Sequence, residues 1–167
     1  NTTTNIDILR LEEKIKQVEE KLRFATNKRL KERQHSLQHL DNHNNALHTI
    51  KHLQAYVVDK LNDMAEKKDT TASMPPTLSF LDINEKVDSS LNTILKSSTS
   101  LQKLKADYTS ALIELKRNVE RLPHRHTALK RHKKRVNKLK VILHKLSAAI
   151  KRSRNLEKQR QNLLEND

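Results

Sequence analysis

The chain contains no glycine in its 167 residues, and this absence restricts its fold more than any other feature. Glycine normally makes up about 7% of a protein, and tight hairpins and left-handed turns depend on it. The residues that dominate instead, such as Leu, Lys, Glu and Arg, all favour helix. The sequence therefore predicts an all-α protein made of long helices with few connections.

Cysteine is also absent, which excludes disulfides, thiolate nucleophiles and cysteine-based zinc sites. No apolar run approaches the roughly 20 residues that span a bilayer, and no signal-peptide pattern opens the sequence. Because the sequence begins with Asn1 rather than Met, we expect it to be a fragment of a longer protein. We expect an intracellular location, cytoplasmic or nuclear, and the sequence does not decide between the two.

The first predicted helix covers about residues 6–68, a stretch without proline in which apolar residues recur at steps of three and four. This apolar seam begins with Ile8, Leu11, Ile15, Val18, Leu22 and Ala25. After a slip of one residue it resumes at Leu30, Leu37, Leu40, Leu47, Ile50, Val57, Leu61 and Met64. If this helix bends, we expect the bend in the polar stretch 41–45.

Residues 69–78 form the predicted linker, because Pro75 and Pro76 cannot lie inside a helix and the Thr and Ser around them favour turns. A second helix, about 80–121, follows with the cleanest heptad pattern of the chain. One column of its seam holds Val87, Ile94, Leu101, Tyr108, Leu115 and Leu122. The other column includes polar residues at Asn84, Ser98 and Lys105, which cost stability but fix register and partner choice.

Pro123 separates the second helix from a third, about 124–165. Its apolar face holds Leu129, Val136, Leu139, Leu143, Leu146, Ile150 and Leu156. The proline either reverses the chain or kinks one long rod, and we favour the reversal because apolar faces of this length need partners. The expected architecture is a single domain, residues 1–167: an elongated antiparallel, coiled-coil-like bundle of three long helices, the first being the longest.

Nearly all of the net charge of +14 lies on the third helix. Residues 123–160 carry 14 Lys and Arg against one Glu, whereas residues 1–68 carry 13 bases against 10 acids. A face that is merely soluble mixes both signs, so we expect this helix to bind an anionic partner. The predicted anion-binding residues are Arg125, Lys130, Arg131, Lys133, Lys134, Arg135, Lys138, Lys140, Lys145, Lys151, Arg152 and Arg154.

Three anionic partners fit this helix: an acidic protein, an anionic membrane or a nucleic acid. Contacts to phosphates would give salt-sensitive, largely sequence-blind binding. No aromatic side chain is interleaved with the bases, which disfavours stacking on single strands. Without a bulky apolar residue among them, adsorption to a membrane would be electrostatic. The stretch 130–135 also fits a nuclear-localisation signal, although such short basic matches are common.

Five histidines follow one another in the first helix, mostly at i+4 spacing: His35, His39, His43, His48 and His52. Pairs at this spacing share a helix face and can bind zinc or copper. A closed site needs three or four converging ligands, and only Asp41 lies nearby. We therefore predict no metal and no other cofactor, and interpret the row as a polar helix face.

Catalysis is not expected, because the sequence has no Gly-rich phosphate loop, no Cys nucleophile and no α/β scaffold for a pocket. We accordingly predict no catalytic residue and no small-molecule substrate. The leading hypothesis is a structural or adaptor subunit of a tethering, cytoskeletal or chromosome-associated assembly. It would contact other subunits through its helical surfaces and an anionic partner through the third helix. The alternative is a direct membrane-lipid or nucleic-acid binding module that uses residues 124–160.

Overall fold

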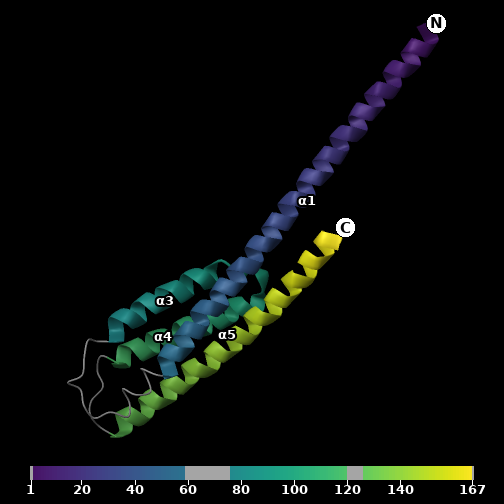
Figure 1. The fold of residues 1–167 in the computed structure, drawn as a ribbon. Helices are drawn as coiled ribbons and strands as arrows, with labels where there is room; N and C mark the ends of the chain where they lie inside the picture. The colour runs from purple at the N-terminus through teal and green to yellow at the C-terminus, as the bar shows by residue number, and fades with distance from the viewer. Residues whose placement is uncertain (1, 59–75, 120–125, 167) are drawn as a thin grey trace. The chain divides into compact units, whose positions relative to one another are not determined.

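A computed structural model describes residues 2–58, 76–119 and 126–166 (Figure 1). Within these ranges there are four α-helices and no strand: α1 (Thr2–Tyr56), α3 (Pro76–Asn92), α4 (Thr99–Val119) and α5 (His126–Asn166). A short 3-10 helix, η2 (Leu95–Ser97), lies between α3 and α4. The prediction of an all-α protein is confirmed, and the first helix, with 55 residues, is the longest of those described.

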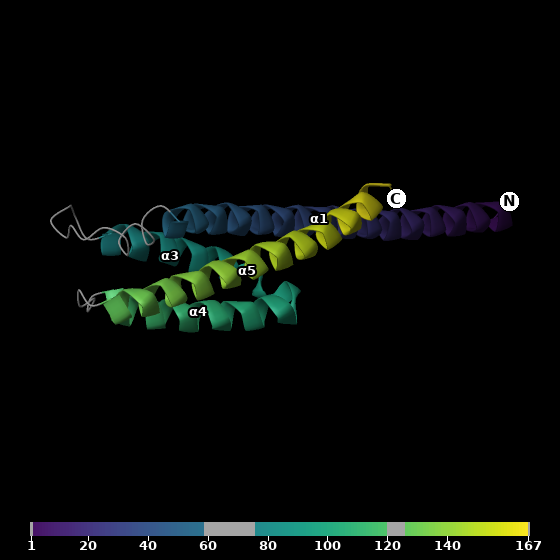
Figure 2. The same cartoon turned by 90° about the horizontal axis from the view of Figure 1, so that it is seen from below.

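Two compact units make up the described chain. One is His39–Lys158, and the other combines Asn1–Gln38 with Gln159–Asp167. In the first unit, α3, α4 and the adjoining parts of α1 and α5 lie side by side around one apolar core (Figures 1 and 2). The largest fully buried side chains of this core are Ile50, Leu53, Leu91, Ile94, Leu101, Tyr108, Leu115, Leu139, Leu143, Leu146 and Ile150.

The prediction of three helices is wrong, because the helix expected over 80–121 is two helices. α3 ends at Asn92, η2 turns the chain, and α4 returns alongside α3 in the opposite direction. The turn is held by short polar side chains that bond to nearby carbonyls: Thr93 Oγ1 donates to Ser90 O (2.6 Å) and Ser97 Oγ to Ile94 O (2.5 Å). Such local bonds compete with the helical ladder and favour a break.

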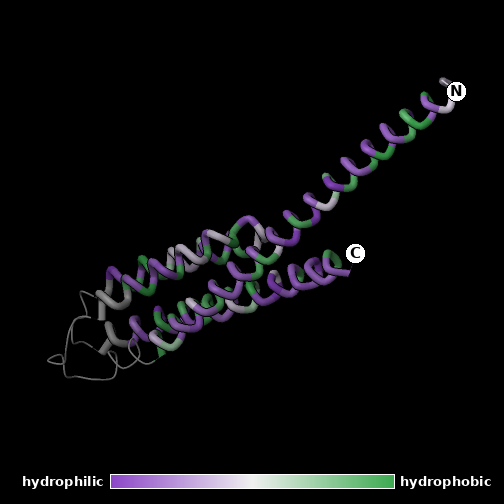
Figure 3. The backbone as a smooth tube through the Cα atoms, turned by 45° about the horizontal axis from the view of Figure 1, so that its top comes forward, coloured by the Kyte–Doolittle hydropathy of each residue, from purple (hydrophilic) through white to green (hydrophobic). Residues whose placement is uncertain are grey.

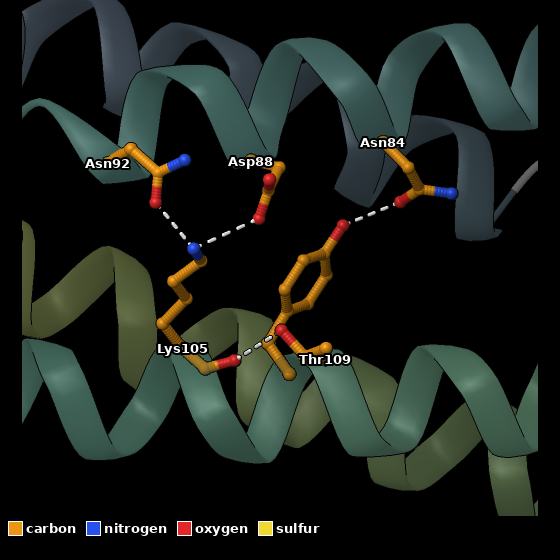
Figure 4. Close-up of polar contacts among 6 residues, drawn as sticks. Asn84, Asp88, Asn92, Lys105 and Thr109 are labelled. Atoms are coloured by element: carbon orange, nitrogen blue, oxygen red, sulfur yellow. Dashed lines mark hydrogen bonds and ion pairs between the residues drawn. The ribbon is translucent and has the colours of Figure 1, made fainter.

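Three polar contacts tie α3 to α4 across this hairpin (Figure 4). Tyr108 Oη donates to Asn84 Oδ1 at 2.5 Å inside the core. Nearer the turn, Lys105 Nζ bonds to Asn92 Oδ1 at 2.5 Å and lies 3.2 Å from Asp88 Oδ1. Asn84 and Lys105, two of the polar residues of the predicted seam, therefore set the register of α3 against α4.

Counted from Ile8, one heptad register describes the buried positions of α1 without a slip at Leu30, and the predicted seam residues Leu47, Ile50 and Val57 do pack on the core. The a positions of this register are Ile8, Ile15, Leu22, Arg29, Ser36, His43, Ile50 and Val57. Its d positions are Leu11, Val18, Ala25, Glu32, His39, Ala46 and Leu53. Ser36 and His43 are buried, whereas Leu30 and Leu37, which we had placed in the seam, are each 49% exposed. The middle of the seam is polar, and α1 continues as helix through residues 41–45.

On α5, the predicted apolar face is confirmed from Val136 to Ile150, and Leu156 is the exception at 68% exposed. Most of the predicted linker 69–78 lies outside the described residues, although α3 already begins at Pro76, a favoured first helical position for proline. Leu61, Met64, Leu122 and Pro123 also lie outside them. The helices on either side of Pro123, α4 and α5, run in opposite directions in Figures 1 and 2, which agrees with a reversal.

Leucine truncations on α1 test this register. Leu53 is fully buried and Leu37 half exposed, so Leu53→Ala should lower the free energy of unfolding by about 2–5 kcal/mol. Leu37→Ala, the matched control, should change it by no more than about 0.5 kcal/mol. Chemical denaturation followed by circular dichroism measures both. Equal losses would contradict the register.

The buried Tyr108 hydroxyl predicts a stability that falls at alkaline pH. Burial, and then the charge of Asp88, raise the pKa of Tyr108 above its usual 10.0. Above about pH 10 the unfolded chain therefore loses this proton while the folded chain keeps it, so the free energy of unfolding falls with rising pH. Below pH 10 both states keep the proton and the full stability is present.

The variant Tyr108→Phe should lose about 1–3 kcal/mol at neutral pH, because Asn84 Oδ1 loses its donor inside the core. Its stability should then fall less steeply than that of the native chain between about pH 10 and pH 11.5. Tyr56→Phe is the comparison variant: burial raises the pKa of the half-buried Tyr56 as well, so its removal should change the alkaline slope less than the removal of the buried Tyr108. Identical alkaline slopes for the native chain and Tyr108→Phe would rule out this role for the hydroxyl.

Candidate anion-binding surface

The outer face of α5 carries most of the predicted anion-binding residues. The core side chains of this helix recur at steps of three and four, which leaves the intervening positions facing away from the core. Eight predicted bases are exposed: Lys130, Arg131, Lys133, Lys134, Lys138, Lys145, Lys151 and Arg152. They span 22 residue steps, or about 33 Å at 1.5 Å per residue. We call these eight residues the basic surface.

The other four predicted residues are placed differently. Arg125 lies outside the described residues, and Arg135, Lys140 and Arg154 are half-buried. Partly buried bases commonly lay their methylene groups along apolar surface. These positions contribute less to a surface that a partner can reach.

Only weak neutralisation of the basic surface comes from the rest of the described chain. Glu114 of α4 lies 3.6 Å from Arg135 Nε and 3.8 Å from Lys138 Nζ, so one carboxylate serves two bases. Exposed pairs of this kind contribute about 0–1 kcal/mol. Within the described residues no carboxylate pairs with Lys130, Lys134 or Lys145. Figure 3 accordingly shows α5 as predominantly hydrophilic along much of its length.

The members of the basic surface lie on one side of α5 because they follow the helical repeat. Lys130, Lys134 and Lys138 are four residues apart, and like charges at this spacing destabilise a helix by a few tenths of a kcal/mol per pair. Packing of α5 on the core holds them together nevertheless, since Val136, Leu139 and the apolar residues that follow are fixed beneath them. An anion laid along this face would relieve the repulsion.

The histidine row of α1 is not uniformly exposed, because it contains the buried His43, which belongs to a polar link between helices. His43 is 1% exposed, its Nδ1 lies 2.5 Å from His39 O, and its Nε2 lies 2.8 Å from Ser153 Oγ of α5. Ser153 Oγ in turn lies 3.2 Å from Ser97 Oγ, at the turn between α3 and α4. The link therefore joins three segments of the unit His39–Lys158.

Two backbone carbonyl oxygens fix some of the donor roles in this link. His39 O and Ile94 O accept only, so Nδ1 of His43 must carry a proton and Ser97 Oγ must donate to Ile94 O. The Ser153 hydroxyl lies between the other two side chains, in contact with His43 Nε2 and with Ser97 Oγ. Because the ring is buried, we interpret this Ser–His contact as a structural link between helices.

The histidines that the structure describes form no closed site with other ligands. Among residues 2–58, 76–119 and 126–166, no group of three or more His, Cys, Asp and Glu side chains is arranged to hold a metal ion. A shallow groove of about 420 Å³ does lie between α1 and α3, and it is lined by His48, Thr49, His52, Asp82, Ile83 and Lys86. Its lining mixes both charge signs, and it shares no residue with the basic surface.

Comparisons with known proteins give no family for this chain. No protein-family model matches it, and neither the curated proteins nor the solved structures provide a significant match. In the described part of the chain, no helix combines the length and the apolarity that crossing a membrane requires.

Sequence reasoning missed two features of this region. The pairing of Arg135 and Lys138 with Glu114 depends on how α4 and α5 pack, and no local pattern signals it. The burial of His43 had a signal: it occupies an a position of the register that begins at Ile8. If that register is continued through the polar residues, and not moved to Leu30 and Leu37, it predicts the burial of His43.

Truncating the serine of the buried link tests its structural role. Ser153→Ala removes the acceptor and donor between His43 and Ser97, so the free energy of unfolding should fall by about 1–3 kcal/mol. Ser147→Ala, also half-buried on α5, is the matched control and should change it by about 0.5 kcal/mol or less. Thermal or denaturant unfolding measures both, and equal stability of the two variants would contradict the link.

Proposed function

We propose that this protein is a non-catalytic structural subunit that docks on an anionic partner through the basic surface of α5. The supporting observation is the row of eight exposed bases over about 33 Å. In the described part of the chain, Glu114 is the carboxylate that pairs with this row, at Lys138. A solvated helix face of ordinary composition would intersperse acids with bases. The charge on this face is therefore largely available to a partner.

The way α5 is held supports docking as a rigid face. Its apolar side is part of the core of the unit His39–Lys158, so its exposed lysines project from a helix that is already ordered. Only the side chains themselves have to be ordered on binding, which lowers the entropic cost relative to a flexible basic tail. A surface with closely spaced negative charges would fit this row.

Electrostatics carries the proposed binding. The exposed face includes Val141, at 53%, as its large apolar residue between Lys130 and Arg152, and one aliphatic side chain offers little to insert into a bilayer. Lys and Arg contacts to phosphates or carboxylates release counterions and are screened by salt. We therefore expect binding that is strong at low ionic strength and largely independent of nucleotide or peptide sequence.

A parallel titration would identify the partner class. The native chain is titrated with duplex DNA, with anionic liposomes and with poly-glutamate, each at about 50 mM and 200 mM salt. For roughly four to six phosphate contacts, affinity should fall by on the order of 10²–10³-fold between these concentrations. Preference for DNA or for liposomes would make the protein itself a nucleic-acid or lipid binding module, and preference for poly-glutamate indicates an acidic protein partner. No salt-sensitive binding to any of the three would contradict the proposal.

Charge reversal tests whether the basic surface carries the binding. Lys130→Glu/Lys134→Glu/Lys145→Glu should lower affinity for the preferred anion at least about tenfold, because each reversal replaces attraction by repulsion. The control Lys96→Glu/Lys103→Glu/Arg117→Glu reverses three exposed bases elsewhere. Both variants lower the net charge from +14 to +8, since each reversal removes two charges. Equal losses in the two variants would show that net charge, and not this surface, determines binding.

A further inference from the structure

The part of the α1 seam nearest the N-terminus is apolar and exposed. Ile8, Leu11, Ile15, Val18 and Leu22 occupy successive a and d positions, and each is between 48% and 66% exposed. Ala25, the next d residue, is exposed as well. Figure 3 shows the hydrophobic residues recurring along this part of the helix. Within the described residues nothing covers this stretch, which we call the free seam (Ile8–Ala25).

The same register is covered further along the helix. In the unit that combines Asn1–Gln38 with Gln159–Asp167, Arg33 Nε donates to Leu164 O near the end of α5 at 3.1 Å, and Ser36 is buried. In the unit His39–Lys158, His43 and Ile50 continue the a column into the core. The free seam is thus the continuation, in unbroken register, of a face that is a helix-packing interface elsewhere in the chain.

We propose that the free seam forms a parallel, in-register two-stranded coiled coil with the free seam of a second copy of this chain. The a positions hold Ile8, Ile15 and Leu22, and the d positions hold Leu11, Val18 and Ala25. The first heptad, with Ile8 at a and Leu11 at d, has the combination that favours two parallel strands. The other two heptads do not have it, so the orientation depends on the flanking charges. The helix is already formed and anchored by its packed part, so pairing does not have to nucleate it.

The charges beside the seam select the parallel orientation. In a parallel pair, Lys14 at a g position faces Glu19 at the e′ position of the second copy. The two-fold symmetry of the pair repeats this attraction on its other side. The Asp7–Glu12′ pair repels, also twice, and it lies at the end of the seam. An antiparallel pair with the same apolar overlap places Lys14 against Lys21′ and Glu12 against Glu19′ along the seam, and attracts at Asp7–Lys28′, at its ends.

Arg29 sets the limit of the coiled coil. It takes the a position that follows Leu22, so a parallel pair would bring two guanidinium groups together there. Pairing over Ile8–Ala25 covers about 26 Å of helix. It ends before Glu32 and Arg33, which are already half-buried within the chain. The surface shares no residue with the basic surface of α5, so this inference extends beyond the proposed function.

Sedimentation equilibrium of the full chain tests the proposal. At about 50–100 µM the native chain should approach twice its mass of 19.5 kDa, as expected for a short coiled coil with micromolar affinity. Ile15→Asp/Leu22→Asp should be monomeric, with unchanged helical circular dichroism because both residues are exposed. The control Leu9→Asp/Phe24→Asp places the same charges on exposed apolar residues outside the seam and should stay dimeric.

The orientation is tested by cross-linking, since the chain has no cysteine of its own. The variant Ile8→Cys should form a disulfide-linked dimer under mild oxidation in a parallel pair, because the two thiols then face each other. In an antiparallel pair they would be more than about 20 Å apart. A monomeric native chain at 100 µM, a dimer that survives Ile15→Asp/Leu22→Asp, or an Ile8→Cys dimer without cross-link would each overturn the proposal.

Discussion

Apolar packing on the a and d positions of α1 is the interaction on which the rest of the structure depends. Ala46, Ile50 and Leu53 are fully buried and belong to one core with residues of α3, α4 and α5. Without glycine-rich turns or disulfides, the described chain relies on this side-to-side packing for its tertiary stability. The remaining features of the molecule are either consequences of it or devices that keep it in register.

Polar contacts inside the bundle set that register. The hydrogen bonds Tyr108–Asn84 and His43–Ser153 each join two helices, and each can form in only one register of those helices. Apolar faces alone would tolerate sliding by one heptad, whereas a buried donor left without its acceptor costs about 1–3 kcal/mol. These contacts therefore contribute more to the choice of one arrangement than to the total stability.

The same packing decides which surfaces remain available. Burying the apolar side of α5 directs its lysines outward, and this produces the basic surface. Along α1, the polar residues Arg29 and Glu32 lie at a and d positions between the free seam and the buried Ser36. The proposed binding to an anion and the proposed pairing of two copies thus use opposite physical forces, one screened by salt and the other strengthened by it.

Composition and periodicity were sufficient to predict the helical class, the buried columns Val87–Leu115 and Val136–Ile150, and the exposure of eight of the twelve predicted bases. They could not predict the hairpin between α3 and α4. Ile94 and Leu101 keep the heptad spacing of seven residues across the turn, so the sequence pattern is the same as that of a continuous helix. Nor could they pair Glu114 with Arg135 and Lys138. A heptad pattern shows which side chains share a face of a helix. Where the helix ends, and which other helix packs on that face, depend on contacts between residues distant in sequence, which only the tertiary structure decides.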